Sequence, residues 1–172
     1  KHTDSNRDCR FDQLVRYEAG VATRSSQDRD HDGRMDAWIV YDAEGRPSEE
    51  TLDESGDGQI DRWTDLGPEG PTRQREDTNA DGEPDVEITL AAGVPVQRQE
   101  DTNFDGRVDR TTKSSPGVSS QVEQDRDHDG RLDARAEFDA AGVKQREERD
   151  EDGDGRYEVV IFYAKGVRVR VE

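Results

Sequence analysis

Four aspartates within nine residues form the most concentrated chemical group in the sequence. They occur in "DRDHDGRMD", residues 28–36, and the same spacing returns in "DRDHDGRLD", residues 125–133. Carboxylates at positions 1, 3 and 5 of a tight loop can converge on one point, and Ca²⁺ binds about six to eight such oxygens. Glycine at position 6 permits the sharp turn because it reaches positive φ without steric cost. The spacing therefore predicts a calcium loop.

The nine-residue pattern occurs seven times in a fixed register. Its copies begin at residues 4, 28, 53, 77, 101, 125 and 150, so successive copies start 24 or 25 residues apart. The consensus is Asp-x-[Asp/Asn/Ser]-x-Asp-Gly-x-x-[Asp/Glu]. A single acidic run is often no more than a solvated surface, but seven phased copies indicate a repeat architecture. We expect one repeat domain, residues 1–172, of seven repeats of about 24 residues, the first of them degenerate.

Six copies contain the glycine, and we expect each of them to bind one calcium ion, about six ions in all. The expected ligands are the side chains at positions 1, 3, 5 and 9, the last directly or through water, and the backbone carbonyl of position 7. The residues at these positions are Asp28, Asp30, Asp32, Arg34, Asp36, Asp53, Ser55, Asp57, Gln59, Asp61, Asp77, Asn79, Asp81, Glu83, Asp85, Asp101, Asn103, Asp105, Arg107, Asp109, Asp125, Asp127, Asp129, Arg131, Asp133, Asp150, Asp152, Asp154, Arg156 and Glu158. The first copy (Asp4, Asn6, Asp8, Asp12) has Cys9 in place of glycine, and we expect it to bind poorly or not at all.

The first six loop positions resemble the EF-hand loop, and they are also similar to the loops of thrombospondin type 3 repeats and dockerins. The resemblance implies calcium binding. The sequence departs from each family, however. Position 12 is Ile39 or Thr64 where an EF-hand has a bidentate glutamate, and thrombospondin-type cysteines and dockerin-type helices are missing. The similarity covers the loops, which are roughly a third of the chain.

The segments between the loops have the composition of β-strands. "RMDAWIVYD" (34–42) and "RYEVVIFYA" (156–164) are rich in β-branched and aromatic residues, and each ends at a turn. Polar return strands such as "PVQRQE" (95–100) follow glycine-containing turns. "YDAEGR" (41–46) resembles the YD (Rhs) repeat, which implies a β-hairpin. We expect an all-β, elongated antiparallel meander of about fourteen strands with the calcium loops along one edge; a β-solenoid is the alternative.

A few residues lie outside this pattern of ligands. His31 and His128 occupy position 4, and we expect them to be surface residues rather than zinc ligands. Trp38 and Trp63 occupy position 11 of consecutive repeats, on the charged face of the strand. They are either a packing pair or an exposed aromatic patch for a glycan or partner protein. Cys9 indicates a decayed capping repeat, with a reactive thiol or lipid attachment as the alternatives.

The composition narrows the function. Only 28% of residues are hydrophobic, 40% are charged, and the net charge is −18, so burial alone cannot offset chain entropy. The acidity argues against nucleic acid, and no apolar run is long enough for membrane insertion. Because one constellation is repeated, we expect no enzyme but a structural or adhesive calcium module of a secreted protein. An extracellular calcium buffer or sensor is the alternative, and an enzyme acting on glycans is a third.

The expected calcium affinity places the protein outside the cell. Extracellular calcium modules bind with dissociation constants of roughly 10⁻⁴–10⁻³ M, which cytosolic calcium does not saturate. The expected location is therefore extracellular, at the cell surface or in the periplasm. Besides calcium, the expected partners are another surface protein or a glycan.

Overall fold

The computed structural model describes residues 1–115 and 117–172. All regular secondary structure in these residues is β. None of the described residues belongs to a helix with the length and apolarity needed to cross a membrane. The chain divides into two compact units, Lys1–Pro84 and Asp85–Glu172.

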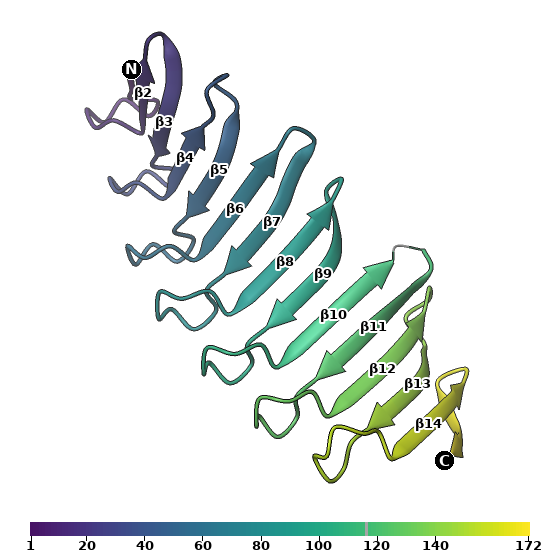
Figure 1. Ribbon diagram of the computed structural model, residues 1–172. Helices are drawn as coiled ribbons and strands as arrows, with labels where there is room; N and C mark the ends of the chain where they lie inside the picture. The colour runs from purple at the N-terminus through teal and green to yellow at the C-terminus, as the bar shows by residue number, and fades with distance from the viewer. Residues whose placement is uncertain (116) are drawn as a thin grey trace. The chain divides into compact units, whose positions relative to one another are not determined.

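Each unit is built of short strands connected in sequence order (Figure 1). The first unit contains β1 (His2–Thr3), β2 (Gln13–Glu18), β3 (Val21–Gln27), β4 (Ala37–Tyr41), β5 (Pro47–Leu52), β6 (Arg62–Gly67) and β7 (Gly70–Glu76). The second unit contains β8 (Val86–Ala91), β9 (Val94–Glu100), β10 (Arg110–Ser115), β11 (Ser119–Gln124), β12 (Ala134–Asp139), β13 (Lys144–Arg149), β14 (Val159–Ala164) and β15 (Val167–Val171).

Within each unit every strand pairs antiparallel with its successor. This pairing confirms the predicted all-β meander and excludes the β-solenoid, whose successive coils would pair in parallel. The described residues form fifteen strands where the sequence predicted about fourteen. The additional strand is β1, whose two residues pair with Gln13 and Leu14.

The two kinds of connection lie at opposite ends of the strands. In each unit of Figure 1, the wide acidic loops are at one end and the tight hairpin turns at the other, as the sequence predicted. Ala19 and Gly20 between β2 and β3 both have positive φ, as do Ala92 and Gly93 between β8 and β9. This is the type I′ geometry that matches the strand twist of a two-residue hairpin.

The apolar core is thin because each unit is a sheet with little covering it. Its buried hydrophobic residues are Ala37, Leu52, Val86, Ala134 and Ile161. Ala37, Val86 and Ala134 all follow directly after an acidic loop, and Ala37 lies directly opposite Leu52. Four of these five buried apolar residues therefore flank an acidic loop, and the fifth, Ile161, lies within β14.

Trp38 and Trp63 are separated by an intervening strand. Trp38 lies opposite Thr51 of β5, and Trp63 lies opposite the same threonine on its other side. In the part of the chain that the structure describes, the aromatic ring pair is that of His2 and Phe11. The two tryptophans are thus not the direct packing pair that was one of the two interpretations of the sequence.

Candidate metal centre

Each acidic loop makes two left-handed backbone turns, at positions 4 and 6. In the second loop these are His31, with φ 65°, and Gly33, with φ 95°. Position 6 was predicted from the recurring glycine, but the turn at position 4 was not. All seven loops have positive φ at position 4, where four different non-glycine residue types occur. The signal for this turn was present in Gly56 and Gly153, which fill position 4 in two of the copies.

The position-1 carboxylate holds the loop closed by accepting two backbone hydrogen bonds. In the second loop, the backbone N–H of His31 donates to Asp28 Oδ1 (2.7 Å), and that of Gly33 donates to Asp28 Oδ2 (2.9 Å). The donors are at positions 4 and 6, so the two left-handed turns aim their N–H groups at one carboxylate. Asp28 is buried. It is therefore a structural residue of the loop as well as a candidate ligand.

The carboxylates at positions 3, 5 and 9 are each oriented by the backbone through one oxygen. Asp30 Oδ1 accepts from the N–H of Asp32 (3.0 Å), and Asp32 Oδ1 accepts from the N–H of Arg34 (2.7 Å). Asp36 Oδ2 accepts from the N–H of Arg29 (2.7 Å). These bonds leave the second oxygen of each carboxylate for another ligand. The loop thus sets the direction of its acids before any ion binds.

Four loops bring acidic oxygens together at a spacing that suits a cation. In each of these groups, one oxygen per residue lies within 4.8 Å of the others. Calcium–oxygen distances are about 2.3–2.6 Å, so ligands on opposite sides of one ion are up to about 5 Å apart. The groups are Asp28–Asp30–Asp32–Asp36, Asp150–Asp152–Asp154–Glu158, Asp4–Asp8–Asp12 and Asp125–Asp127–Asp133. The oxygen-only donor set fits a hard cation such as calcium.

The third, fourth and fifth loops keep the same backbone pattern with fewer acids. Position 3 is Ser55, Asn79 or Asn103 in these loops. The position-1 acid still accepts from positions 4 and 6; for example, Asp77 accepts from Gly82 N–H at 2.7 Å. Within the described residues, the loops starting at Asp53 and Asp101 do not gather three acidic oxygens as closely as the four groups above. In the fourth loop, the position-9 residue Asp85 belongs to the second unit.

Two parts of the predicted ligand set are not among the closely grouped carboxylates: Asp129 and the backbone carbonyls of position 7. Asp129 is outside the close group of its loop, although its Oδ1 accepts from the N–H of Arg131 at 2.9 Å. The backbone carbonyls of position 7 (Arg34, Gln59, Glu83, Arg107, Arg131 and Arg156) remain predicted ligands. The contact that the structure gives position 7 is the N–H bond to the position-5 acid.

The first loop has the geometry of the others despite its cysteine. Cys9 adopts φ 71°, and its N–H donates to Asp4 Oδ2 at 3.1 Å, as glycine does elsewhere. Cys9 is exposed. The expectation of weak binding in this loop therefore rests on the strain of a non-glycine residue with positive φ, and no longer on a missing turn. Its binding strength stays a prediction.

Neighbouring loops are joined by direct contacts that the sequence did not predict. The N–H of Asp28 donates to the carbonyl of Asp12 in the preceding loop (2.8 Å), and the same bond links Asp125 to Asp109 (2.7 Å). The side chains of His31 and His128, which were expected to be simple surface residues, also contact the preceding loop. His31 Nδ1 lies 3.3 Å from Asp12 Oδ1. In these two loops the position-4 histidine therefore contacts the position-9 acid of the loop before it.

Hydrogen bonds within and between loops lower the pKa of two position-9 acids, Asp12 and Asp109. The hydrogen bonds from the Ser5 hydroxyl and the Ser5 N–H lower the pKa of Asp12 from 3.8 to about 2, although burial opposes the shift. Burial also raises the pKa of Asp109, but the Thr102 and His128 hydrogen bonds outweigh it, so the pKa falls. The hydrogen bond to Asp109 raises the pKa of His128. Both acids are thus held in the charged form that a cation requires.

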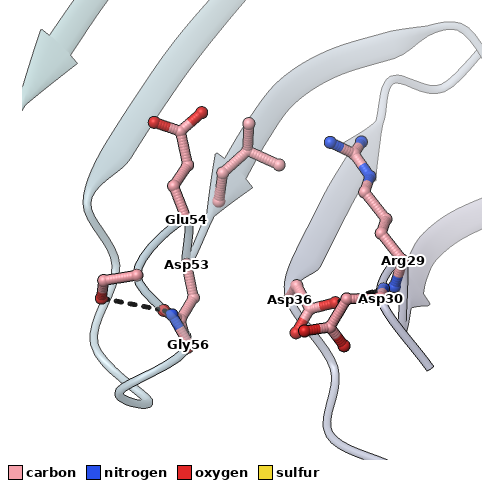
Figure 2. Close-up of a pocket in the computed structure, with 8 residues that line it drawn as sticks. Arg29, Asp30, Asp36, Asp53, Glu54 and Gly56 are labelled. Atoms are coloured by element: carbon pink, nitrogen blue, oxygen red, sulfur yellow. Dashed lines mark hydrogen bonds between the residues drawn. The ribbon is translucent and has the colours of Figure 1, made fainter. Parts of the chain in front are cut away.

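A groove of about 290 Å³ separates the second loop from the third in the first unit. Figure 2 shows the carboxylates of Asp30 and Asp36 beside each other on one side, with Asp53 and Gly56 on the other. Arg29 of this groove pairs with Glu50 (2.6 Å) on the neighbouring strand β5. Water and ions can therefore reach the acidic oxygens from the side of the loop.

In comparisons with known proteins, the chain matches no family model and no curated protein. The similarity to thrombospondin type 3, EF-hand and YD repeats therefore remains a resemblance of loops and hairpins.

Proposed function

We propose that this chain is a non-enzymatic calcium-binding repeat module that serves as a structural or adhesive segment of a secreted or cell-surface protein. The observation that carries the proposal is the second loop, which is repeated along the chain. Its four carboxylates converge within 4.8 Å while backbone N–H groups fix their orientation. Such a preorganised, oxygen-only set is what a calcium site requires.

The loop-to-loop hydrogen bonds support a mechanical role. An ion bound in one loop would order a position-9 residue whose carbonyl holds the next loop, as Asp12 holds Asp28. Calcium would then stiffen the units repeat by repeat, which is the behaviour of repeat proteins with nearest-neighbour contacts. Calcium at millimolar concentration, found outside the cytosol, suits loops without a bidentate glutamate. The proposed partners are another surface protein or a glycan.

The test is a direct count of bound calcium. Equilibrium dialysis of the full chain in millimolar calcium, followed by metal analysis, should find about six ions per chain, with dissociation constants of about 10⁻⁴–10⁻³ M. The same dialysis with magnesium should retain few ions, because magnesium demands a tight octahedron and dehydrates reluctantly. A chain that retains no calcium under these conditions would overturn the proposal.

A further inference from the structure

The first unit carries a shallow groove on the sheet face that holds the tryptophans. Leu14, Ser26 and Trp38 form one cross-strand row, and Arg16 and Arg24 form the next. Residues directly opposite each other in an antiparallel pair, and residues two apart on one strand, project from the same face. These five side chains therefore lie together, and they line a groove of about 220 Å³.

The two arginines of this groove are an unusual pair. Arg16 lies directly opposite Arg24, and like charges in opposed positions are destabilising in a sheet. Most arginines on the strands pair with acids, as Arg98 does with Glu100 (2.9 Å). Among the described residues, neither Arg16 nor Arg24 has an acidic partner, and both are exposed. A pair of opposed like charges that no neighbouring acid neutralises is typical of a binding site, where a ligand supplies the opposite charge.

The residues directly opposite the two arginines of the groove are not acidic. The nearest acid in the row of Arg24 is Glu49, beyond Val40 of β4. Two strand spacings put the Cα atoms of the two residues about 10 Å apart, so Glu49 is not a direct cross-strand neighbour of Arg24. The groove therefore presents two accessible guanidinium groups to a ligand that carries negative charge.

The ring of Trp38 beside the two arginines favours an anion that also carries a sugar ring. Trp38 is half-buried, so its ring forms one wall of the groove and keeps a surface open to solvent. An indole face packs well on the C–H face of a pyranose ring, and a guanidinium fork binds a carboxylate or sulfate through two parallel hydrogen bonds. Diagonal neighbours across two strands, such as Trp38 and Arg24, are about 7–8 Å apart. One sugar residue can span that distance.

We propose that this groove binds an acidic saccharide, a sugar chain that carries carboxylate or sulfate groups. The ring of one sugar stacks on Trp38, and its anionic group is held between Arg16 and Arg24. This names a partner class for the calcium module proposed above, and no metal ion takes part in the binding. An acidic peptide would use the arginines but would have no need of the indole, so the saccharide accounts for more of the groove.

The test uses tryptophan fluorescence of the full chain in constant millimolar calcium. Trp63→Phe leaves Trp38 as the single reporter in the groove, and Trp38→Phe leaves Trp63 as a reporter outside it. The probes are oligogalacturonate, sulfated dextran, neutral dextran and polyglutamate. We expect at least one of the first two probes to change the emission of Trp63→Phe saturably, with little response in Trp38→Phe and none to neutral dextran.

Charge-matched variants separate the groove from the net charge. Arg16→Gln/Arg24→Gln should weaken binding at least about tenfold, because two charge-assisted hydrogen bonds are lost. Arg168→Gln/Arg170→Gln, on the exposed strand β15, removes the same charge and should leave affinity unchanged. Equal weakening by both pairs, an equal response to polyglutamate, or no response to either acidic saccharide overturns the proposal. Circular dichroism and the bound-calcium count of each variant show whether the calcium module itself has failed.

Discussion

The residue-level feature that recurs in the loops is a carboxylate with one oxygen held by a backbone N–H hydrogen bond and the other oxygen left free. Asp30 and Asp36 illustrate it, since each accepts from a backbone N–H in its own loop. The arrangement lowers the entropic cost of ion binding, because the side chains are ordered beforehand. Its cost is a backbone that must turn left-handed twice in six residues, once at a position filled mostly by non-glycine residues.

The strain at position 4 makes a prediction about single residues. Ala80 has φ 60°, a conformation that costs an L-residue about 1–2 kcal/mol and that glycine adopts freely. Ala80→Gly should therefore raise the free energy of unfolding by up to about 1 kcal/mol, after the greater chain entropy of glycine is subtracted. Urea unfolding in calcium measures it. Ala22→Gly in β3, without positive φ, should instead destabilise by about 0.5–1 kcal/mol; equal effects would refute the strain argument.

The lowered pKa of Glu147 predicts how the stability of the fold depends on pH. Burial opposes its ionisation, but hydrogen bonds from Lys144 Nζ (2.9 Å), Arg149 Nε (2.6 Å) and Tyr163 Oη (3.0 Å) prevail, and its pKa falls from 4.5 to about 2. A depressed folded-state pKa stabilises the fold above the unfolded pKa, and the contribution is lost as the pH drops.

The measurement is the stability difference between the parent protein and Glu147→Gln across the acid range. The difference should be constant above about pH 5 and should shrink between about pH 4.5 and pH 2. Glu49→Gln on β5, which changes the same formal charge on a strand of the first unit, is the control for the loss of one carboxylate. A difference for Glu147→Gln that stays flat to pH 2 would contradict the assigned hydrogen bonds.

At the scale of elements, the loop, strand, turn and strand form one repeating piece, and its parts differ in how far the sequence predicted them. The strands and turns followed from β-branched runs such as Ala37–Tyr41 and from glycines such as Gly93, because both signals are local. The contacts of His31 with Asp12, and the arginine pair of Arg16 and Arg24, were not predicted. They depend on the register between neighbouring strands and loops, which residue types within one repeat do not fix.

Because the sequence of one repeat does not show these longer-range contacts, the strand boundaries and the first strand were also not predicted correctly. The sequence suggested that strands begin directly after Gly33, whereas β4 begins at Ala37, because Arg34 and Asp36 are used by the loop. β1 is only two residues long and has no β-branched run of its own. It forms because the Lys1 backbone exchanges hydrogen bonds with Val15 (2.6 and 2.8 Å), a tertiary contact.

One prediction belongs to the loop as an element. Asp105 occupies position 5 of the fifth loop, and its Oδ1 accepts from the Arg107 N–H at 2.9 Å. Asp105→Ala should lower the calcium count by one ion, and loss of the backbone hydrogen bond should destabilise the calcium-loaded protein by about 1 kcal/mol in addition. Glu69→Ala, an exposed acid in the turn between β6 and β7, removes the same charge and should keep every ion. Metal analysis that finds equal counts in the two variants would disprove the loop assignment.

For the molecule as a whole, the balance between charge and core decides whether the chain folds. The 43 acidic residues face 25 basic ones, and more than half of the acids lie in the seven nonapeptides. Salt links such as Arg135 to Glu148 compensate charge on the strands, but the loops place their acids next to one another. The five buried hydrophobic residues give little apolar burial to offset this repulsion.

Calcium is expected to supply the missing stability. Six ions would add twelve positive charges and change the net charge from −18 to about −6. We therefore predict that the chain is largely unfolded in chelator and β-rich and protease-resistant in millimolar calcium, with magnesium a poor substitute. Circular dichroism during a calcium titration, with limited proteolysis at each point, measures the transition. It should be gradual, because within each unit every repeat contacts mainly its neighbours. If the chelated chain keeps both its β-signal and its protease resistance, the backbone hydrogen bonds accepted by the carboxylates of Asp28 and its equivalents hold the loops unaided, and calcium is an accessory.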